Sequence, residues 1–120
     1  MASQESPIAV FLPRVAERAR FAADKMQKLD CAVLDRLQLG LNCFEPGQSQ
    51  RVHAHEGADK FYLMLSGKAT ITVGGETREV STGDLVVAPA GIEHGVETAL
   101  ERTVMLVGIT RQVGRPPATS

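Results

Sequence analysis

The three histidines of this 120-residue chain occur in two short patterns that also contain glycine. The first pattern reads Gly47-x5-His53-x-His55, and the second reads Gly83-x5-Pro89-x-Gly91-x2-His94. One residue separates His53 from His55, so on a β-strand both imidazoles project from the same face, as two ligands of one metal must. We therefore predict a metal site to which another strand brings His94.

A site made of three neutral imidazoles has a defined chemistry. It leaves two or three coordination positions open for water, substrate or dioxygen. Because the ligands carry no charge, the metal stays strongly Lewis acidic and favours an anionic or chelating molecule such as a diketone, an enediol or a carboxylate. We expect a divalent transition metal, with Fe, Mn, Ni and Zn as the alternatives, and a small-molecule ligand or substrate.

The two patterns resemble the paired motifs of the cupin superfamily, whose members are small antiparallel β-barrels that often hold a divalent metal. The resemblance spans Gly47 to Thr98, with 15 residues between Gly67 and Gly83. It implies an all-β fold, an antiparallel jelly-roll β-barrel with a single cupin domain and a short N-terminal arm. The metal ligands that it implies are His53, His55 and His94. Dioxygenase, isomerase and lyase chemistry, or non-catalytic binding or sensing of a small ligand, are all compatible with such a fold.

The sequence departs from the family's motifs at two positions. Lys60 stands where the first motif has a carboxylate, and Thr98 replaces the asparagine that commonly closes the second motif. If Lys60 points inward, its ammonium would repel a divalent cation and could replace the metal as the positive charge in the pocket. It would then bind a substrate carboxylate or, once deprotonated, act as a base. A one-residue bulge after Gly57 would instead bring Asp59 inward and restore a fourth ligand. A further alternative is that Lys60 extends to solvent from the barrel mouth.

The register of the family's motif implies that Lys60 faces inward, and Tyr62 and Met64 lie on the same face of that strand, so the three side chains are candidates for the lining of a substrate pocket. Lys60 and Tyr62 are also the candidate catalytic residues, because Tyr62 is the only tyrosine and its hydroxyl would donate to a bound oxyanion. Simple core filling is the alternative for Tyr62 and Met64. Glu93 and Glu97 flank His94, and we expect both to be solvated.

Short strands must position these residues. Between Leu37 and Cys43 apolar side chains alternate with Gln38, Gly40 and Asn42, which is the period of a half-buried strand. The next predicted strand carries Arg51, His53 and His55 on one face. Further strands are expected at 61–65, 69–73, 77–80, 85–88, 95–98 and 104–110, with a Gly74-Gly75 hairpin turn. Many short strands at turn spacing favour a barrel or jelly roll.

Length and charge exclude several classes of protein. With 120 residues and 43% hydrophobic content, the chain has room for one domain. Thirteen basic and fourteen acidic side chains give no electrostatic footprint for nucleic acid or for an anionic membrane. The sequence has neither a membrane-length apolar run nor the layout of a signal peptide at its start, so we expect a cytoplasmic protein. Cys31 and Cys43 are expected to be buried apolar residues.

The pattern divides the chain into an N-terminal arm (1–20), a cupin barrel domain (21–110) and a flexible tail (111–120). The arm contains the apolar stretch Ile8 to Leu12 and a short helical turn after Pro13. The stretch would form an edge strand, either exchanged with a neighbouring subunit or packed on its own barrel. Because the arm is apolar and the sheet edges need cover, we predict a homodimer with the arm at its interface.

Overall fold

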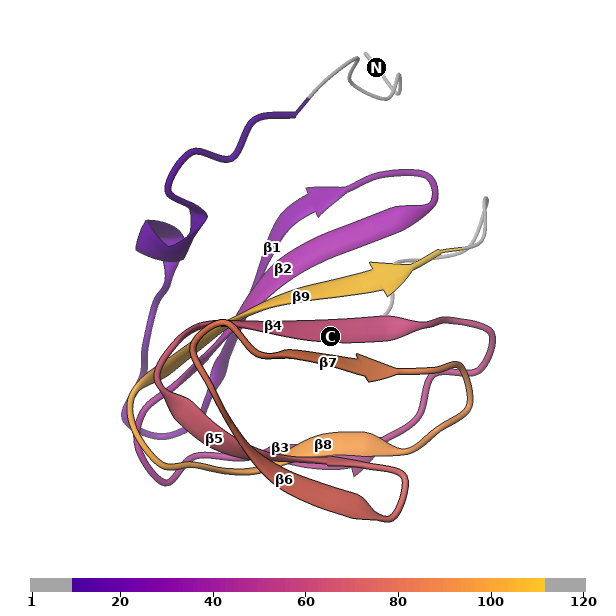
Figure 1. The fold of residues 1–120 in the computed structure, drawn as a ribbon. Helices are drawn as coiled ribbons and strands as arrows, with labels where there is room; N and C mark the ends of the chain where they lie inside the picture. Colours follow the sequence, from indigo (N-terminus) through magenta and orange to yellow (C-terminus); the bar gives the residue numbers. More distant parts are fainter. Residues whose placement is uncertain (1–9, 112–120) are drawn as a thin grey trace.

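The computed structural model describes residues 10–111, while residues 1–9 and 112–120 lie outside the described range. Its strands form two sheets that face each other, with orders β1-β2-β9-β4-β7 and β3-β8-β5-β6 (Figure 1). The strands are β1 (Gln27–Val33), β2 (Leu37–Phe44), β3 (Gln50–His53), β4 (Lys60–Ser66), β5 (Lys68–Val73), β6 (Glu76–Ser81), β7 (Leu85–Ala88), β8 (His94–Ala99) and β9 (Thr103–Thr110). Every pairing is antiparallel. The all-β jelly-roll prediction is confirmed. No helix within residues 10–111 is long and apolar enough to cross a membrane.

Strand β1 was not expected from the sequence. It pairs with β2 and forms one edge of the five-stranded sheet. Its Leu29 and Cys31 are half-buried, whereas Lys28 and Asp30, which alternate with them, are exposed. A register shift between Asp30 and Ala32 interrupts the alternation. A short, charged and bulged edge strand carries little of the periodic signal by which strands are predicted.

Strand β2 is buried on both faces. Its polar residues Gln38 and Asn42 are 4% and 0% exposed. They share a face with Phe44, which packs in the barrel interior. The opposite face, with Leu41 and Cys43, packs in a second cluster outside the barrel. The expected half-buried strand is therefore wrong in one respect, because its polar face lies inside the barrel and not in water.

The segment before β1 covers part of the outer face of the five-stranded sheet. A 3-10 helix follows Pro13, as expected, over Val15–Arg18. The cluster that it joins contains Val15, Ala19, Phe21, Leu29, Cys31, Leu41, Cys43, Leu65, Val104 and Leu106. Both cysteines are free thiols in this apolar cluster; Cys43 is buried, as expected, whereas Cys31 is only half-buried. The sheet thus separates two apolar cores.

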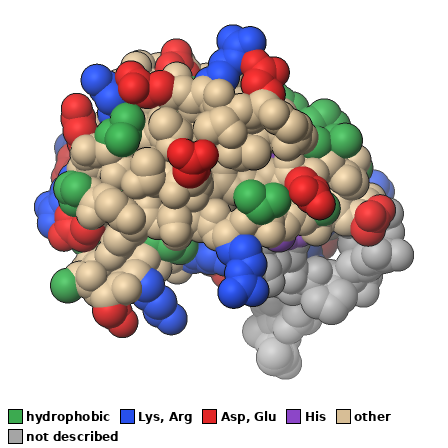
Figure 2. Space-filling view, turned by 90° about the horizontal axis from the view of Figure 1, so that it is seen from below, with side chains coloured by type: hydrophobic (Ala, Val, Ile, Leu, Met, Phe, Trp, Pro, Cys, Tyr) green, Lys and Arg blue, Asp and Glu red, His purple; other side chains and the backbone are tan. Residues whose placement is uncertain are grey.

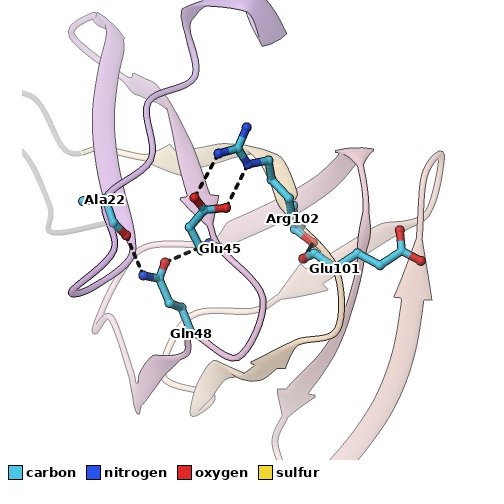
Figure 3. Close-up of polar contacts among 6 residues, drawn as sticks. Ala22, Glu45, Gln48, Glu101 and Arg102 are labelled. Carbon is cyan, nitrogen blue, oxygen red and sulfur yellow. Dashed lines mark hydrogen bonds and ion pairs between the residues drawn. The ribbon is translucent and has the colours of Figure 1, made fainter.

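Polar contacts fasten this segment to the loop between β2 and β3 (Figure 3). Arg102 forms a two-pronged ion pair with Glu45, at 2.8 and 2.9 Å. The guanidinium of Arg102 also lies 4.0 Å from the ring centre of Phe21, a cation–π contact. From the same loop, the amide of Gln48 donates to the carbonyl oxygen of Ala22 at 2.7 Å. We call the five residues Phe21, Ala22, Glu45, Gln48 and Arg102 the latch.

The ends of the chain are only partly described. Of the expected strand Ile8 to Leu12, residues 8 and 9 lie outside the described range, and residues 10–12 form no strand. Phe11 is 85% exposed. The expected flexible tail lies outside the described residues apart from Arg111. The division into arm, barrel and tail, the arm's exchange and the homodimer stay predictions.

Gly67 and Gly83, which both belong to the two motifs, adopt left-handed backbone conformations with φ of +88° and +94°. A Cβ at Gly67 would lie 2.3 Å from the carbonyl oxygen of Arg102, whereas a Cβ at Gly83 would meet nothing within 4 Å. Gly83→Ala should therefore cost only the conformational strain, about 1–2 kcal/mol. We expect Gly67→Ala to lower the free energy of unfolding in urea by about 3 kcal/mol or more. If Gly67→Ala and Gly83→Ala lower the free energy of unfolding equally, the close approach of Arg102 and Thr103 does not require glycine at position 67.

Candidate metal centre

His53, His55 and His94 come together from two separate segments of the chain. His53 ends β3 and is the cross-strand partner of His94, the first residue of β8. The ring centroids lie 4.9 Å apart for His53 and His55, 4.5 Å for His53 and His94, and 5.3 Å for His55 and His94. The candidate ligand nitrogens all lie within 4.8 Å of one another. The expected cluster therefore forms, but the strand predicted to carry both His53 and His55 ends at His53.

Backbone hydrogen bonds hold His55 in place beyond the end of β3. Its carbonyl oxygen accepts from the amide of Gly91 at 3.0 Å, so the turn of the second motif fastens the loop of the first. Asp59 contributes to the same link, because its carboxylate accepts from the amide of Ala90 at 2.9 Å. The pairing of β4 with β7 runs without a shift from Lys60 onward. The alternative in which a bulge brings Asp59 inward therefore does not occur: Asp59 is exposed and lies outside the histidine cluster.

The hydrogen bonds of two histidines fix which nitrogen carries the proton. Nδ1 of His53 lies 2.7 Å from the carbonyl oxygen of Arg51, and Nδ1 of His94 lies 2.9 Å from that of Ile92. Because a carbonyl oxygen only accepts, each Nδ1 is the donor and each Nε2 keeps its lone pair. Among the described residues, Nε2 of all three histidines is buried without a hydrogen-bond partner. Buried polar atoms are rarely left so, and the cluster is therefore compatible with a divalent metal.

The protonation state of the cluster agrees with this reading. Burial lowers the pKa of His53, His55 and His94, and the charge of Lys60 lowers each of them further. For His55 the pKa falls to about 4. The imidazoles are therefore neutral at pH 7, which is the form that binds a metal.

Lys60 lies inside the barrel. It is 1% exposed, and its Nζ lies 4.7 Å from the ring centre of Tyr62. The alternative in which Lys60 extends to solvent is therefore wrong. Tyr62 and Met64 are 0% and 1% exposed, which confirms the shared inward face. Burial, with a smaller contribution from the charge of Lys28, lowers the pKa of Lys60 to about 7.

Tyr62 connects the cluster to residues that sequence reasoning missed. Its hydroxyl donates to Oε1 of Gln50 at 3.0 Å, and its ring centroid lies 6.2 Å from that of His94. Burial raises the pKa of Tyr62, so the hydroxyl stays protonated at neutral pH.

Asn42 was also missed: both atoms of its amide are buried without a partner among the described residues. Its only signal in the sequence was its place on the polar face of β2.

A hollow of about 380 Å³ opens beside the histidines. Its lining residues are Lys28, Gln50, Arg51, His53, Ala54 and His55. This volume falls within the range of small-molecule sites, about 300–1,000 Å³. A larger hollow of about 510 Å³, lined by β6 and β7, does not touch the histidines. The smaller hollow is therefore the candidate ligand site, because His53 and His55 line it. Little of the histidine side chains is visible from the side of the four-stranded sheet (Figure 2). Glu93 and Glu97 are exposed, as expected.

Comparison with known proteins agrees with the geometry. The Cupin domain family matches residues 40–109. The chain is 42% identical over 60 residues to an uncharacterised protein of Streptomyces coelicolor, SCO3923, and 37% identical over 57 residues to dimethylsulfoniopropionate lyase DddW of Ruegeria pomeroyi. Each match covers 48% of this chain, but only 54% and 37% of the respective relative, so the chain spans about half or less of these proteins.

Solved structures with the same fold match over more of their length. The protein TT1209 from Thermus thermophilus is 34% identical with a TM-score of 0.77, and the match covers 82% of this chain and 94% of that one. KdgF from Halomonas sp. is 27% identical with a TM-score of 0.69, covering 74% of this chain and 81% of that one.

Tyr62→Phe tests the buried hydrogen bond to Gln50. Because the variant leaves a buried acceptor without its donor, we expect the free energy of unfolding to fall by about 1–2 kcal/mol in urea titrations. Thr72→Val is the matched control: it breaks the hydroxyl pair of Thr72 and Thr77, 2.7 Å apart and exposed. The control should change stability by less than about 0.5 kcal/mol. If Tyr62→Phe is as silent as the control, the hydroxyl does not hold Gln50 in solution.

Proposed function

As the chain belongs to the cupin domain family, we propose that His53, His55 and His94 bind one divalent transition metal, and that the barrel holds a small oxygen-rich or anionic molecule beside it. The observation that carries the proposal is the convergence of three buried Nε2 atoms without partners. Their lone pairs are available because the rings are neutral, and in two of them a backbone carbonyl fixes the orientation. Fe, Mn, Ni and Zn all accept such ligands.

A metal at this site would supply Lewis-acid chemistry, and with Fe or Mn also redox chemistry, through positions that the three histidines leave open. The chain's own residues would select the ligand. Lys60 places positive charge in the interior, which favours a carboxylate or another anionic oxygen. Tyr62, which stays protonated, would donate a hydrogen bond to a ligand oxygen, and Met64 would supply apolar lining.

We propose an enzyme, with lyase chemistry ahead of isomerase or dioxygenase chemistry. The support is the 37% identity to a protein named dimethylsulfoniopropionate lyase, together with Lys60. Its pKa of about 7 lets a substantial fraction of its amine accept a proton at neutral pH. Lys60 and Tyr62 are thus the candidate catalytic residues.

A non-catalytic barrel that binds or senses a small ligand is the second candidate. It is favoured by one observation: within residues 10–111, no carboxylate joins the three histidines, and Asp59 is engaged with a backbone amide. Turnover by the metal-loaded protein with dimethylsulfoniopropionate, diketones, thiols and sugars, together with dioxygen consumption, separates the two. A cytoplasmic location and a homodimer also remain proposals.

Elemental analysis of the untagged, dialysed protein tests the metal site. We expect close to one metal ion per chain in the wild type and almost none in His53→Ala/His94→Ala, since two of the three ligands are lost. Glu97→Gln, an exposed change on β8, is the control and should keep the metal. A wild type that remains without metal after reconstitution with Fe, Mn, Ni and Zn would favour a metal-free ligand-binding barrel.

Replacing Lys60 tests its influence on the metal. Lys60→Glu exchanges a repelling charge for a fourth ligand, so we expect the metal dissociation constant to fall by at least about tenfold, or about 1.4 kcal/mol. Lys60→Met removes the charge without adding a ligand and should give a smaller gain. Competition with a chromophoric chelator measures the metal dissociation constants of the wild type, Lys60→Glu and Lys60→Met. If both variants bind the metal with unchanged affinity, the charge of Lys60 does not influence metal binding.

A further inference from the structure

Strands β1 and β3 lie at edges of different sheets, and a groove runs along the seam between them. The hollow beside the histidines forms its inner part. A second hollow of about 500 Å³ continues it outward along the same strands and shares Lys28, Gln50 and Arg51 with the first. The histidines therefore stand at one end of a continuous groove that is longer than the metal site alone requires.

The charged side chains that line this groove are all basic. They are Lys25, Lys28 and Arg51. None of the three forms an ion pair within the part of the chain that the structure describes, whereas Arg14, Lys68, Arg78 and Arg102 each pair with a glutamate. The nearby acid on β1, Asp30, accepts a hydrogen bond from Gln38. Three unpaired cations in a concave surface produce a positive potential that attracts anions.

Lys28 joins the groove to the barrel interior. It lines both hollows, and its charge acts on Lys60, His53 and His55, lowering the pKa of each. Lys60 itself is buried beside Tyr62. Positive charge is thus present at two depths, with Lys60 inside the barrel and Lys28 and Arg51 in the groove. A ligand with one anionic group would reach only one of these two regions.

We propose that the site takes a molecule with two anionic groups, such as a dicarboxylate, one placed at the histidines and Lys60 and the other in the groove between Lys28 and Arg51. The inference rests on the proposed function, since the inner group lies at the proposed metal site. It adds that the groove determines specificity: Lys28 and Arg51 recognise the far end of the ligand.

Isothermal titration calorimetry with the metal-loaded full chain tests this proposal. The probes are succinate, glutarate and adipate, each compared with the monocarboxylate of equal carbon number. We expect at least one dicarboxylate to bind about tenfold or more tightly than its monocarboxylate, because two further charge contacts form in a partly enclosed groove. Lys28→Gln/Arg51→Gln should abolish that preference, because it weakens the binding of the dicarboxylate much more than that of the monocarboxylate. Lys68→Gln, the loss of a paired lysine outside the groove, should retain the preference.

Three results would overturn the proposal: no binding of any dicarboxylate at 10 mM, no preference over the monocarboxylates in the wild type, or a preference that survives in Lys28→Gln/Arg51→Gln. The last result would mean that both carboxylates bind at the metal itself. The metal content of every sample, measured separately, keeps the two proposals apart. A protein that binds metal but not dicarboxylates overturns only the groove, whereas a protein without metal overturns the proposed function.

Discussion

The burial of basic groups in the barrel interior is the constraint on which the rest of the site depends. Three imidazoles and Lys60 share its interior, and burial favours the uncharged form of each. The Nε2 atoms of the three neutral imidazoles are buried without hydrogen-bond partners among the described residues, which favours a metal ion as their partner. A dication and an anion change the balance of charge in opposite directions, so each should bind more tightly when the other is present. Under the proposed function, the metal and the anionic molecule would therefore bind cooperatively.

The two histidine segments are joined to each other beyond the end of β3. Strand β3 ends at His53, and His55 is held by the amide of Gly91 from the loop before β8. Asp59 links the start of β4 to the same loop through Ala90. Asp59, the residue considered as a fourth ligand after a shift in register, thus helps to hold together the two loops that carry the histidines.

Much of the barrel could be predicted from local signals, because alternation, turn glycines and histidine spacing are properties of neighbouring residues. The inward face of Lys60, Tyr62 and Met64 was implied by the register of the cupin motif, and the period of a strand placed the three side chains together on it. Strand β1 escaped because a bulge and surface charges conceal its alternation. The burial of Asn42 was hidden for a different reason: its face is covered by the opposite sheet. The groove was beyond prediction, since Lys28 and Arg51 lie on strands that share no hydrogen bonds and no spacing in sequence relates them.

The latch has a consequence for where the folding unit begins. The family resemblance covers residues 40–109, yet the outer core reaches back to Val15, and Arg102 near the end of the match holds Phe21 near the beginning of the chain. A fragment cut at the limits of the resemblance would lose strand β1 and leave Leu41 and Cys43 facing water. Expressed alone, such a fragment would be expected to aggregate. The region that matches the family, residues 40–109, is therefore shorter than the smallest unit expected to fold on its own, which reaches back to Val15.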